Sequence, residues 1–498
     1  MSTGTTYATE PTTITQSLNY SGPKKLIAAL ATLRLGVVTP DMGRCTEILQ
    51  QELPFQEFTY PSGYSHNGWT VPQEWYVEKA TIHNADGELI YDGLSHLLGV
   101  CIYSNSFIAG IGGAELKKHL FYAHNYDDAL IYHVDWVYKP HKRDWGFSVT
   151  KDFYNSINDR DAFHVELRTV HKPGHMRSLV ATVTPEQGYD ANEVMNISYH
   201  SSGSSFILCA HDCHPHLCND DLSGIAVGVE VMRRLPQNRR HTYHFVVSPE
   251  HYGTIMLLQD PNACFLREAK GGLFLEAYGT QGALALQRSF TGVALIDRAV
   301  RNVITGGYVP ATLEGVGPYG DWYEKAFRGV AGNDETTFEA PGIEVPFASL
   351  TRYPFKEYHT SHDNVALMDP AKLEEAVQVV LATIDILEND CVMTRTCPDG
   401  LVCLSNPKYD LYQNCWDPSI PGRSSKEEIG QKAIKLNQLM DCFPRYLDGK
   451  TTCLQIAERF NLPFRAVRDY AAAWEQKGLL KSSPAPIDNG VPRSIPPW

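Results

Sequence analysis

The sequence lacks any apolar run of roughly 18 residues, the length that a membrane-spanning helix requires. It also lacks a secretory signal at its start, because residues 1–17 are polar and rich in Thr and Ser, with no apolar core and no cleavage site. We therefore expect no membrane span. With no export signal, we predict a cytoplasmic protein.

The cysteines lack the spacing of a metal-binding or disulfide framework. There are 12 of them, scattered from Cys45 to Cys453 without a CxxC pair. In a reducing compartment such cysteines stay as free thiols. The sequence therefore argues against a disulfide-stabilised secreted fold.

Positive charge is also scarce. The chain has 43 Lys and Arg against 57 Asp and Glu, a net charge of −14, which disfavours general binding to nucleic acid. Residues 424–498 are the exception, with 11 basic against 8 acidic residues. The 43% hydrophobic content supports packed interiors, and 498 residues are too many for one core. We expect two or three domains.

The first part of the chain predicts two helices and then a β-rich module. Apolar spacing predicts helices over residues 23–34 and 44–53. From residue 60 to residue 147, short aromatic and β-branched runs alternate with turn residues. We predict that residues 60–147 form a β-rich domain, inserted into a catalytic domain made of residues 1–59 and 148–390.

From residue 161 the pattern alternates between strands and helices, which favours an α/β fold with a mostly parallel sheet flanked by helices. We expect strands at 206–210, 244–247, 272–275 and 345–350, and helices at 221–235 and 369–387. Residues 391–423 have no periodicity and predict a linker. Residues 424–498 predict a helix-turn-helix domain, with a turn at Asn461 and a helix starting near Pro463.

Three clusters of polar residues follow expected strands. The first is the loop 211–221, which contains three His, three Asp and two Cys; the others are 248–253 and 357–364. Imidazole, carboxylate and thiolate groups are all zinc ligands. Because ligands bind at the carboxyl ends of strands in open α/β sheets, the three clusters together predict a metal site.

These residues resemble the zinc aminopeptidase and glutamate carboxypeptidase family. The resemblance rests on the run 219–224, a His at the preceding strand end, Glu250 after the next strand, and Tyr358-His359-Thr360 before Asp363. More closely, the chain is similar to a subgroup of aminopeptidases with an inserted β domain and a C-terminal winged helix. Supporting motifs lie at 61–63, 69–75, 143–147, 341–346 and 352–353. The likeness covers about residues 24–498.

The resemblance implies a zinc-dependent hydrolase. His214 would be the first metal ligand, with His211 as the alternative. Asp220 would be the central carboxylate, able to bridge two ions, and His359 the distal ligand. Glu250 would be the general base that takes a proton from water.

The chain departs from the family at two positions. Many relatives have a carboxylate where His251 stands, and an Asp where the strand ends in Glu276. Both residue types can bind zinc, so His251 and Glu276 could complete a second site. The closer subgroup has no ligands at these positions. The expectation is one zinc ion, or two.

Substrate contacts are expected from Asp334 and Glu335, which would orient a ligand or bind an amine. Arg352, with the neighbouring Tyr353, would recognise a carboxylate, unless Arg352 forms a structural salt bridge. Cys213 and Cys218 are expected to be packing residues.

The sequence therefore predicts hydrolysis of an amide bond, by an aminopeptidase-like exopeptidase or by a deacylase or peptidase acting on a biosynthetic intermediate. Two alternatives stay open. One is a single-zinc enzyme like glutaminyl cyclase, and the other is a ligand-sensing regulator without hydrolase activity. For the winged helix we expect protein contact, such as homo-oligomerisation, in preference to nucleic acid, because its positive charge is small.

Overall fold

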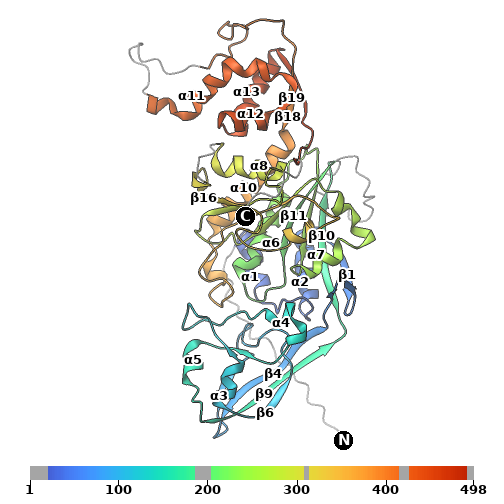
Figure 1. Cartoon of the computed structure of the whole chain (residues 1–498), viewed down its shortest axis with the longest axis vertical. Helices are drawn as coiled ribbons and strands as arrows, with labels where there is room; N and C mark the ends of the chain where they lie inside the picture. Colours follow the sequence, from blue (N-terminus) through green and yellow to red (C-terminus); the bar gives the residue numbers. More distant parts are fainter. Residues whose placement is uncertain (1–20, 186–203, 308–312, 414–425, 491–498) are drawn as a thin grey trace.

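The computed structural model describes residues 21–185, 204–307, 313–413 and 426–490. Three regions follow one another along the long axis of the molecule (Figure 1). A large sheet with its helices lies in the middle, an antiparallel sheet lies at one end, and the C-terminal helices lie at the other. Residues 1–17 and part of the expected linker fall outside the described residues.

The large sheet has nine strands and is mixed. Its four central strands, in the order β12-β11-β13-β17, are parallel, while the strands on both sides include antiparallel pairs. In spatial order the strands are β1 (Gln56–Pro61), β10 (His175–Val183), β12 (Thr242–Ser248), β11 (Ser205–His211), β13 (Gly272–Glu276), β17 (Phe347–Thr351), β14 (Leu284–Gln287), β16 (Gly320–Lys325) and β15 (Glu314–Gly317). The expected α/β fold is confirmed, and the sheet is parallel at its centre and between β14 and β16.

Alternate residues of β11 point into two different hydrophobic cores. Phe206, Leu208 and Ala210 pack into one core, and Ile207 and Cys209 into the other. A strand buried on both faces must be apolar throughout, which explains the continuous apolar run. The first core contains residues of α1 (Pro23–Leu30), α2 (Met42–Glu52), α6 (Ser223–Arg233), α8 (Leu295–Thr305) and α10 (Pro370–Asn389); the second contains residues of α7 (Tyr252–Leu257) and α9 (Glu335–Phe338).

A separate antiparallel sheet has the strand order β5-β4-β9-β6. Its strands are β4 (Glu74–Asn84), β5 (Leu89–Asp92), β6 (Phe107–Gly112) and β9 (Ala162–Lys172). Strand β9 lies beyond the expected boundary at residue 147, so this sheet uses a later part of the chain. Residues near the start of β9 alternate between buried and exposed, as an antiparallel strand with one solvated face requires.

The chain between residues 65 and 156 also forms several smaller elements. They are the hairpin β2 (Ser65–His66) and β3 (Trp69–Thr70), the parallel pair β7 (Leu120–Phe121) and β8 (Phe147–Ser148), and the short helices α3 (Gly113–Leu116), α4 (Asp135–Tyr138) and α5 (Lys151–Ser156).

The C-terminal region contains three helices and a small antiparallel sheet. They are α11 (Lys426–Cys442), α12 (Cys453–Phe460) and α13 (Phe464–Gln476), with β18 (Cys391–Arg395), β19 (Asp448–Thr452) and β20 (Leu480–Pro484). The expected helix-turn-helix is present as α12 and α13, with Asn461 in the left-handed conformation between them. Strand β18 lies in the expected linker and is the central strand of the small sheet.

The C-terminal region is docked on α8. Asn302 of α8 donates a hydrogen bond to the Leu462 carbonyl (3.1 Å) and accepts one from the Phe464 N–H (2.8 Å). Arg298 forms an ion pair with Glu458 (2.6 Å between Nη2 and Oε2).

Among the described helices, none combines the length and hydropathy that crossing a membrane would require.

Candidate metal centre

The candidate site lies at the carboxyl ends of the central parallel strands. Strand β11 ends at His211, β12 ends two residues before Glu250, and β13 ends at Glu276. The chain passes from β11 to β12 on one side and later to β13 on the other side. A reversal of strand order of this kind opens a crevice at the sheet edge, where α/β proteins bind ligands.

The loop after β11 is held by buried carboxylates. Asp363 accepts hydrogen bonds from the N–H groups of Asn219 (2.6 Å) and Asp220 (3.1 Å). Asp221 accepts from the N–H of His211 (3.2 Å) and of Gly224 (3.1 Å). These bonds tie the end of β11 to the start of α6 and fix the position of Asp220.

Asp220 is the centre of a cluster of possible metal ligands. Its Oδ1 lies 3.2 Å from His211 Nε2 and 3.2 Å from His214 Nδ1, and its Oδ2 lies 3.1 Å from His359 Nε2. Ligand atoms within 4.8 Å of one another form three sets: His214, Asp220 and His359; His211, Asp220 and Glu276; and His211, Cys213 and His214. Asp220 belongs to two of these sets.

Several of these atoms are buried without a hydrogen bond. Within the described residues, both oxygens of Asp220, both ring nitrogens of His211, and Nε2 of His359 make no hydrogen bond of acceptable geometry, although His211 Nε2 and His359 Nε2 lie 3.2 and 3.1 Å from Asp220 oxygens. Buried polar atoms almost always have a partner, and each exception needs an explanation. A cation among these atoms would satisfy them together, so the residues fit a metal ion.

The charges of the site also suit a cation. Burial, and then the negative charge of Asp220, raises the pKa of Glu276 to about 8. Burial opposes the ionisation of Asp220, but the charge of His214 and contacts with His211 and His359 hold the pKa of its carboxyl well below the usual range. A positive ion would relieve the repulsion between the two carboxylates.

Glu250 lies beside this cluster. Its Oε2 accepts a hydrogen bond from the Tyr138 hydroxyl (2.7 Å) and lies 3.6 Å from His214 Nε2. Burial would raise the pKa of Glu250, but contact with His214 and the charge of His251 lower it to about 2. Glu250 belongs to none of the three ligand sets found among the described residues, so it remains available to act as a base.

His251 lies between Glu250 and Asp334, outside the three ligand sets. Its Nε2 is 3.6 Å from Glu250 Oε1, and its Nδ1 is 3.7 Å from Asp334 Oδ1. Burial lowers its pKa, but the contact with Asp334 outweighs this and raises it to about 9. Of the two residues expected in a second metal site, the structure therefore brings Glu276 to the cluster and directs His251 toward Asp334.

The residues expected to bind substrate are mostly engaged inside the protein. Glu335 is completely buried and bonds to Gln287 Nε2 (2.9 Å). Arg352, 2% exposed, forms an ion pair with Glu375. Tyr353 is partly exposed, and its ring packs against Tyr358, which stacks on His359. Arg352 therefore forms the structural salt bridge that was the alternative expectation, and Tyr353 lies near the cluster of possible metal ligands.

Residues from the β-rich region complete the site, and sequence reasoning missed them. The ring of Tyr132 lies against His214 and His359, with ring centroids 4.9 and 5.3 Å apart. The Tyr132 N–H donates to the His359 carbonyl (2.8 Å). Tyr138 contacts Glu250, from which it is 112 residues distant in sequence. No local motif marks either tyrosine.

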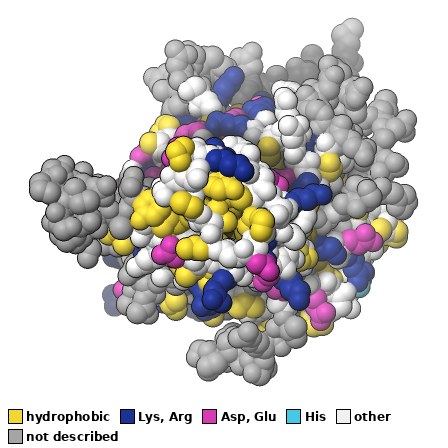
Figure 2. Space-filling model, turned by 90° about the horizontal axis from the view of Figure 1, so that it is seen from above, with side chains coloured by type: hydrophobic (Ala, Val, Ile, Leu, Met, Phe, Trp, Pro, Cys, Tyr) yellow, Lys and Arg dark blue, Asp and Glu magenta, His cyan; other side chains and the backbone are white. Residues whose placement is uncertain are grey.

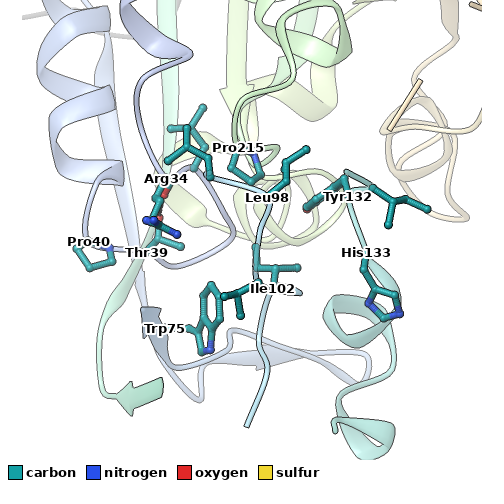
Figure 3. Close-up of a pocket in the computed structure, with 13 residues that line it drawn as sticks. Arg34, Thr39, Pro40, Trp75, Leu98, Ile102, Tyr132, His133 and Pro215 are labelled. Atoms are coloured by element: carbon teal, nitrogen blue, oxygen red, sulfur yellow. Dashed lines mark hydrogen bonds between the residues drawn. The ribbon is translucent and has the colours of Figure 1, made fainter. Parts of the chain in front are cut away.

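Two cavities lie close to the site. A small cavity of about 20 Å³, enough for about one water molecule, is lined by Tyr132, Pro215 and Trp75, among other residues (Figure 3). A larger cavity of about 420 Å³ opens beside His251, and Trp69 and Arg267 also line it. His251 lines the larger cavity, and its Nε2 lies 3.6 Å from Glu250 Oε1.

A comparison with protein families decides the membership of this chain. The family described as "Domain of unknown function (DUF4910)" matches residues 24–390, about three quarters of the sequence. The chain belongs to the DUF4910 family. The match ends just before β18 and so leaves the C-terminal region outside.

Relatives of this DUF4910 protein include a Clostridium acetobutylicum protein, described as a candidate polysaccharide biosynthesis protein with an aminopeptidase-like domain. The two are 27% identical over 464 residues, which cover 92% of this chain and 95% of the relative. A crystal structure of a candidate peptidase from C. acetobutylicum matches with a TM-score of 0.71 and 25% identity, over 93% of this chain and 96% of the other.

A zinc aminopeptidase from Bacillus subtilis matches less closely. Its TM-score is 0.50 at 12% identity, over 73% of the DUF4910 chain and 93% of the aminopeptidase. At this identity the match shows the fold alone. The mixed α/β sheet described above is thus shared with solved peptidase structures.

Proposed function

We propose that this protein is a zinc-dependent hydrolase of the peptidase type that cleaves an amide bond. The observation that carries the proposal is the group of buried, unpaired ligand atoms around Asp220, with Glu250 beside it. The fold shared with peptidase structures supports the same conclusion. The proposed metal residues are Asp220, His359 and His214, with His211 and Glu276 able to hold a second ion through Asp220.

The chain's own residues supply the proton transfers. A bound zinc ion lowers the pKa of water to about 7 and polarises a carbonyl group. Glu250 accepts a proton from water at a carboxylate oxygen and passes it to the leaving nitrogen. The Tyr138 hydroxyl orients this carboxylate, and the Tyr132 ring packs against His214 and His359.

We propose that the substrate extends from Glu250 toward the cavity beside His251. Apolar side chains such as Ile255 and Ile343 line this cavity, together with the exposed guanidinium of Arg267. Such a lining suits an apolar group with a negative charge. A biosynthetic intermediate that carries an acyl or aminoacyl group has this character, and the description of the C. acetobutylicum relative supports this class.

The test of the proposal is metal content together with amide hydrolysis. Zinc measured by plasma mass spectrometry should copurify with the wild type and be lost from Asp220→Asn and His359→Ala. The same measurement on His211→Ala and His214→Ala decides which histidine is the first ligand. Product mass separates hydrolysis from cyclisation. Wild-type protein that takes up no zinc when zinc is offered would refute the proposal.

The domain plan is part of the proposal. We propose a catalytic domain of residues 1–59 and 148–390 without β9, a β-rich insertion of residues 60–147 whose sheet β9 completes, and a C-terminal winged helix at 424–498. The helix-turn-helix and the small sheet support the winged helix, and pairing of β18 with β19 and β20 suggests that it begins at Cys391.

We also propose that the protein is cytoplasmic. The free thiols of the described cysteines are consistent with that compartment.

We propose that the C-terminal region binds protein in preference to DNA. A helix-turn-helix reads DNA through the N-terminal residues of its second helix. Here the start of α13 faces the body, because Arg465 forms an ion pair with Asp385 of α10 (2.8 Å). Hydrophobic side chains gather on the end of the molecule seen in Figure 2, with Lys and Arg around them. Light scattering should detect a homo-oligomer that a protein lacking residues 391–498 does not form.

A further inference from the structure

Cys213 differs from the other buried cysteines. Cysteine behaves in a protein interior as a small hydrophobic residue. Six buried cysteines do so here, because they pack in the two hydrophobic cores: Cys45, Cys101, Cys209, Cys218, Cys391 and Cys453. Cys213 is buried too, but in the part of the chain that the structure describes it belongs to neither core. Packing therefore explains Cys218 and does not explain Cys213.

The surroundings of the Cys213 sulfur are polar. Its Sγ lies within 4.8 Å of ring nitrogens of His211 and His214. The N–H of Glu250 donates a hydrogen bond to Sγ (3.3 Å). The sulfur thus accepts a backbone hydrogen bond, as a thiolate bound to a metal does, and it faces two imidazoles.

His211 supplies the second observation. Its side chain is 1% exposed, and among the described residues neither ring nitrogen makes a hydrogen bond of acceptable geometry, although Nε2 faces Asp220 Oδ1 at 3.2 Å. A buried imidazole normally bonds through at least one nitrogen. One sulfur and two imidazoles are donors that zinc prefers.

We propose that Cys213 is a ligand of the metal centre, and that its sulfur binds zinc as part of a third ligand set, with His211 and His214, that shares one histidine with each of the two sets assigned above. The thiol loses its proton to solvent when the ion binds. This inference rests on the proposed zinc-dependent function. It predicts that the centre favours zinc and other thiophilic ions over magnesium or manganese, which prefer oxygen ligands.

X-ray absorption at the zinc edge tests the proposal on the full-length protein. A sulfur ligand gives a scattering shell at about 2.3 Å, whereas nitrogen and oxygen ligands lie at about 2.0–2.2 Å. The wild type loaded with zinc should show the longer shell. Cys213→Ser should bind zinc without that shell, and Cys218→Ser, a change in the same loop, should keep it.

The outcomes separate this inference from the proposed function. Zinc bound with nitrogen and oxygen ligands only would overturn the role of Cys213 and leave the metal centre in place. Failure of the wild type to bind zinc would overturn both. If Cys213→Ser does not fold by circular dichroism, Cys213→Ala replaces it, and a sulfur shell that survives in either variant contradicts the proposal.

Discussion

The two ends of the central sheet both bury histidines, but in different ways. At the carboxyl ends, two ring nitrogens of His211 and one of His359 make no hydrogen bond of acceptable geometry. At the amino ends, His241 contacts Ser204 Oγ (2.6 Å) and the Leu387 carbonyl (3.1 Å), and His244 contacts Thr182 Oγ1 (2.9 Å). His211 is as buried as His241 and His244, so the hydrogen bonds, and not burial or residue type, distinguish this candidate metal ligand from a structural histidine.

The largest expected effect is the loss of the ion. Asp220→Asn removes the charge that the buried histidines surround, so zinc should be lost and kcat/KM should fall at least ~10³-fold. His241→Gln, at the opposite end, should keep zinc. Metal analysis and a hydrolysis assay check both variants. Loss of zinc from His241→Gln would show that hydrogen bonding does not distinguish metal-binding histidines from structural ones.

Glu250→Gln should act on catalysis alone. The amide keeps the shape of the side chain but cannot accept the proton, so kcat/KM should fall ~10²–10⁴-fold. Zinc content should not change, because Glu250 belongs to none of the ligand sets. Full activity in this variant would assign the base to another residue.

Tyr138→Phe should reduce kcat/KM about 10- to 100-fold, since a hydrogen bond to a charged group contributes about 1.5–3 kcal/mol. Tyr91→Phe is the matched control. The Tyr91 hydroxyl donates to the Ser148 carbonyl, elsewhere in the β-rich region. Equal losses in the two variants would indicate a general effect on folding, which thermal unfolding would reveal.

The smallest effect concerns His244 at the amino end. Burial lowers its pKa to about 3 in the folded protein, against about 6.5 when unfolded. Below pH 6.5 the unfolded chain therefore binds a proton that the folded chain does not. The free energy of unfolding should fall by about 2 kcal/mol between pH 7 and pH 5 from this group. Urea unfolding of His244→Gln should show a smaller fall than the wild type.

The sequence predicted the parts of the site that follow strands. His211, Glu250 and Glu276 come at or just after the carboxyl ends of apolar runs, so their convergence followed from the parallel sheet. The pairing of Arg352 with Glu375 was foreseen only as an alternative, because a sequence does not show which of several acids a buried cation meets.

Contacts between distant segments could not be predicted. Tyr132 and Tyr138 lie in a region whose strands show only local alternation, and nothing local indicates that they contact His359 and Glu250. For the same reason the expected boundary at residue 147 left β9 outside the β-rich region. Its alternating pattern fits any half-buried strand, and only its pairing with β4 and β6 decides its position.

The backbone contact between residues 130–132 and 359–361 limits how this protein could be re-engineered. Leu130 and Ser361 exchange hydrogen bonds (3.0 and 2.8 Å), and the Tyr132 N–H bonds to the His359 carbonyl (2.8 Å). The β-rich region is therefore not a detachable accessory. In a chimera that takes this region from another family member, the donor's backbone would set the position of His359. Residues 130–132 and 359–361 must therefore be exchanged together.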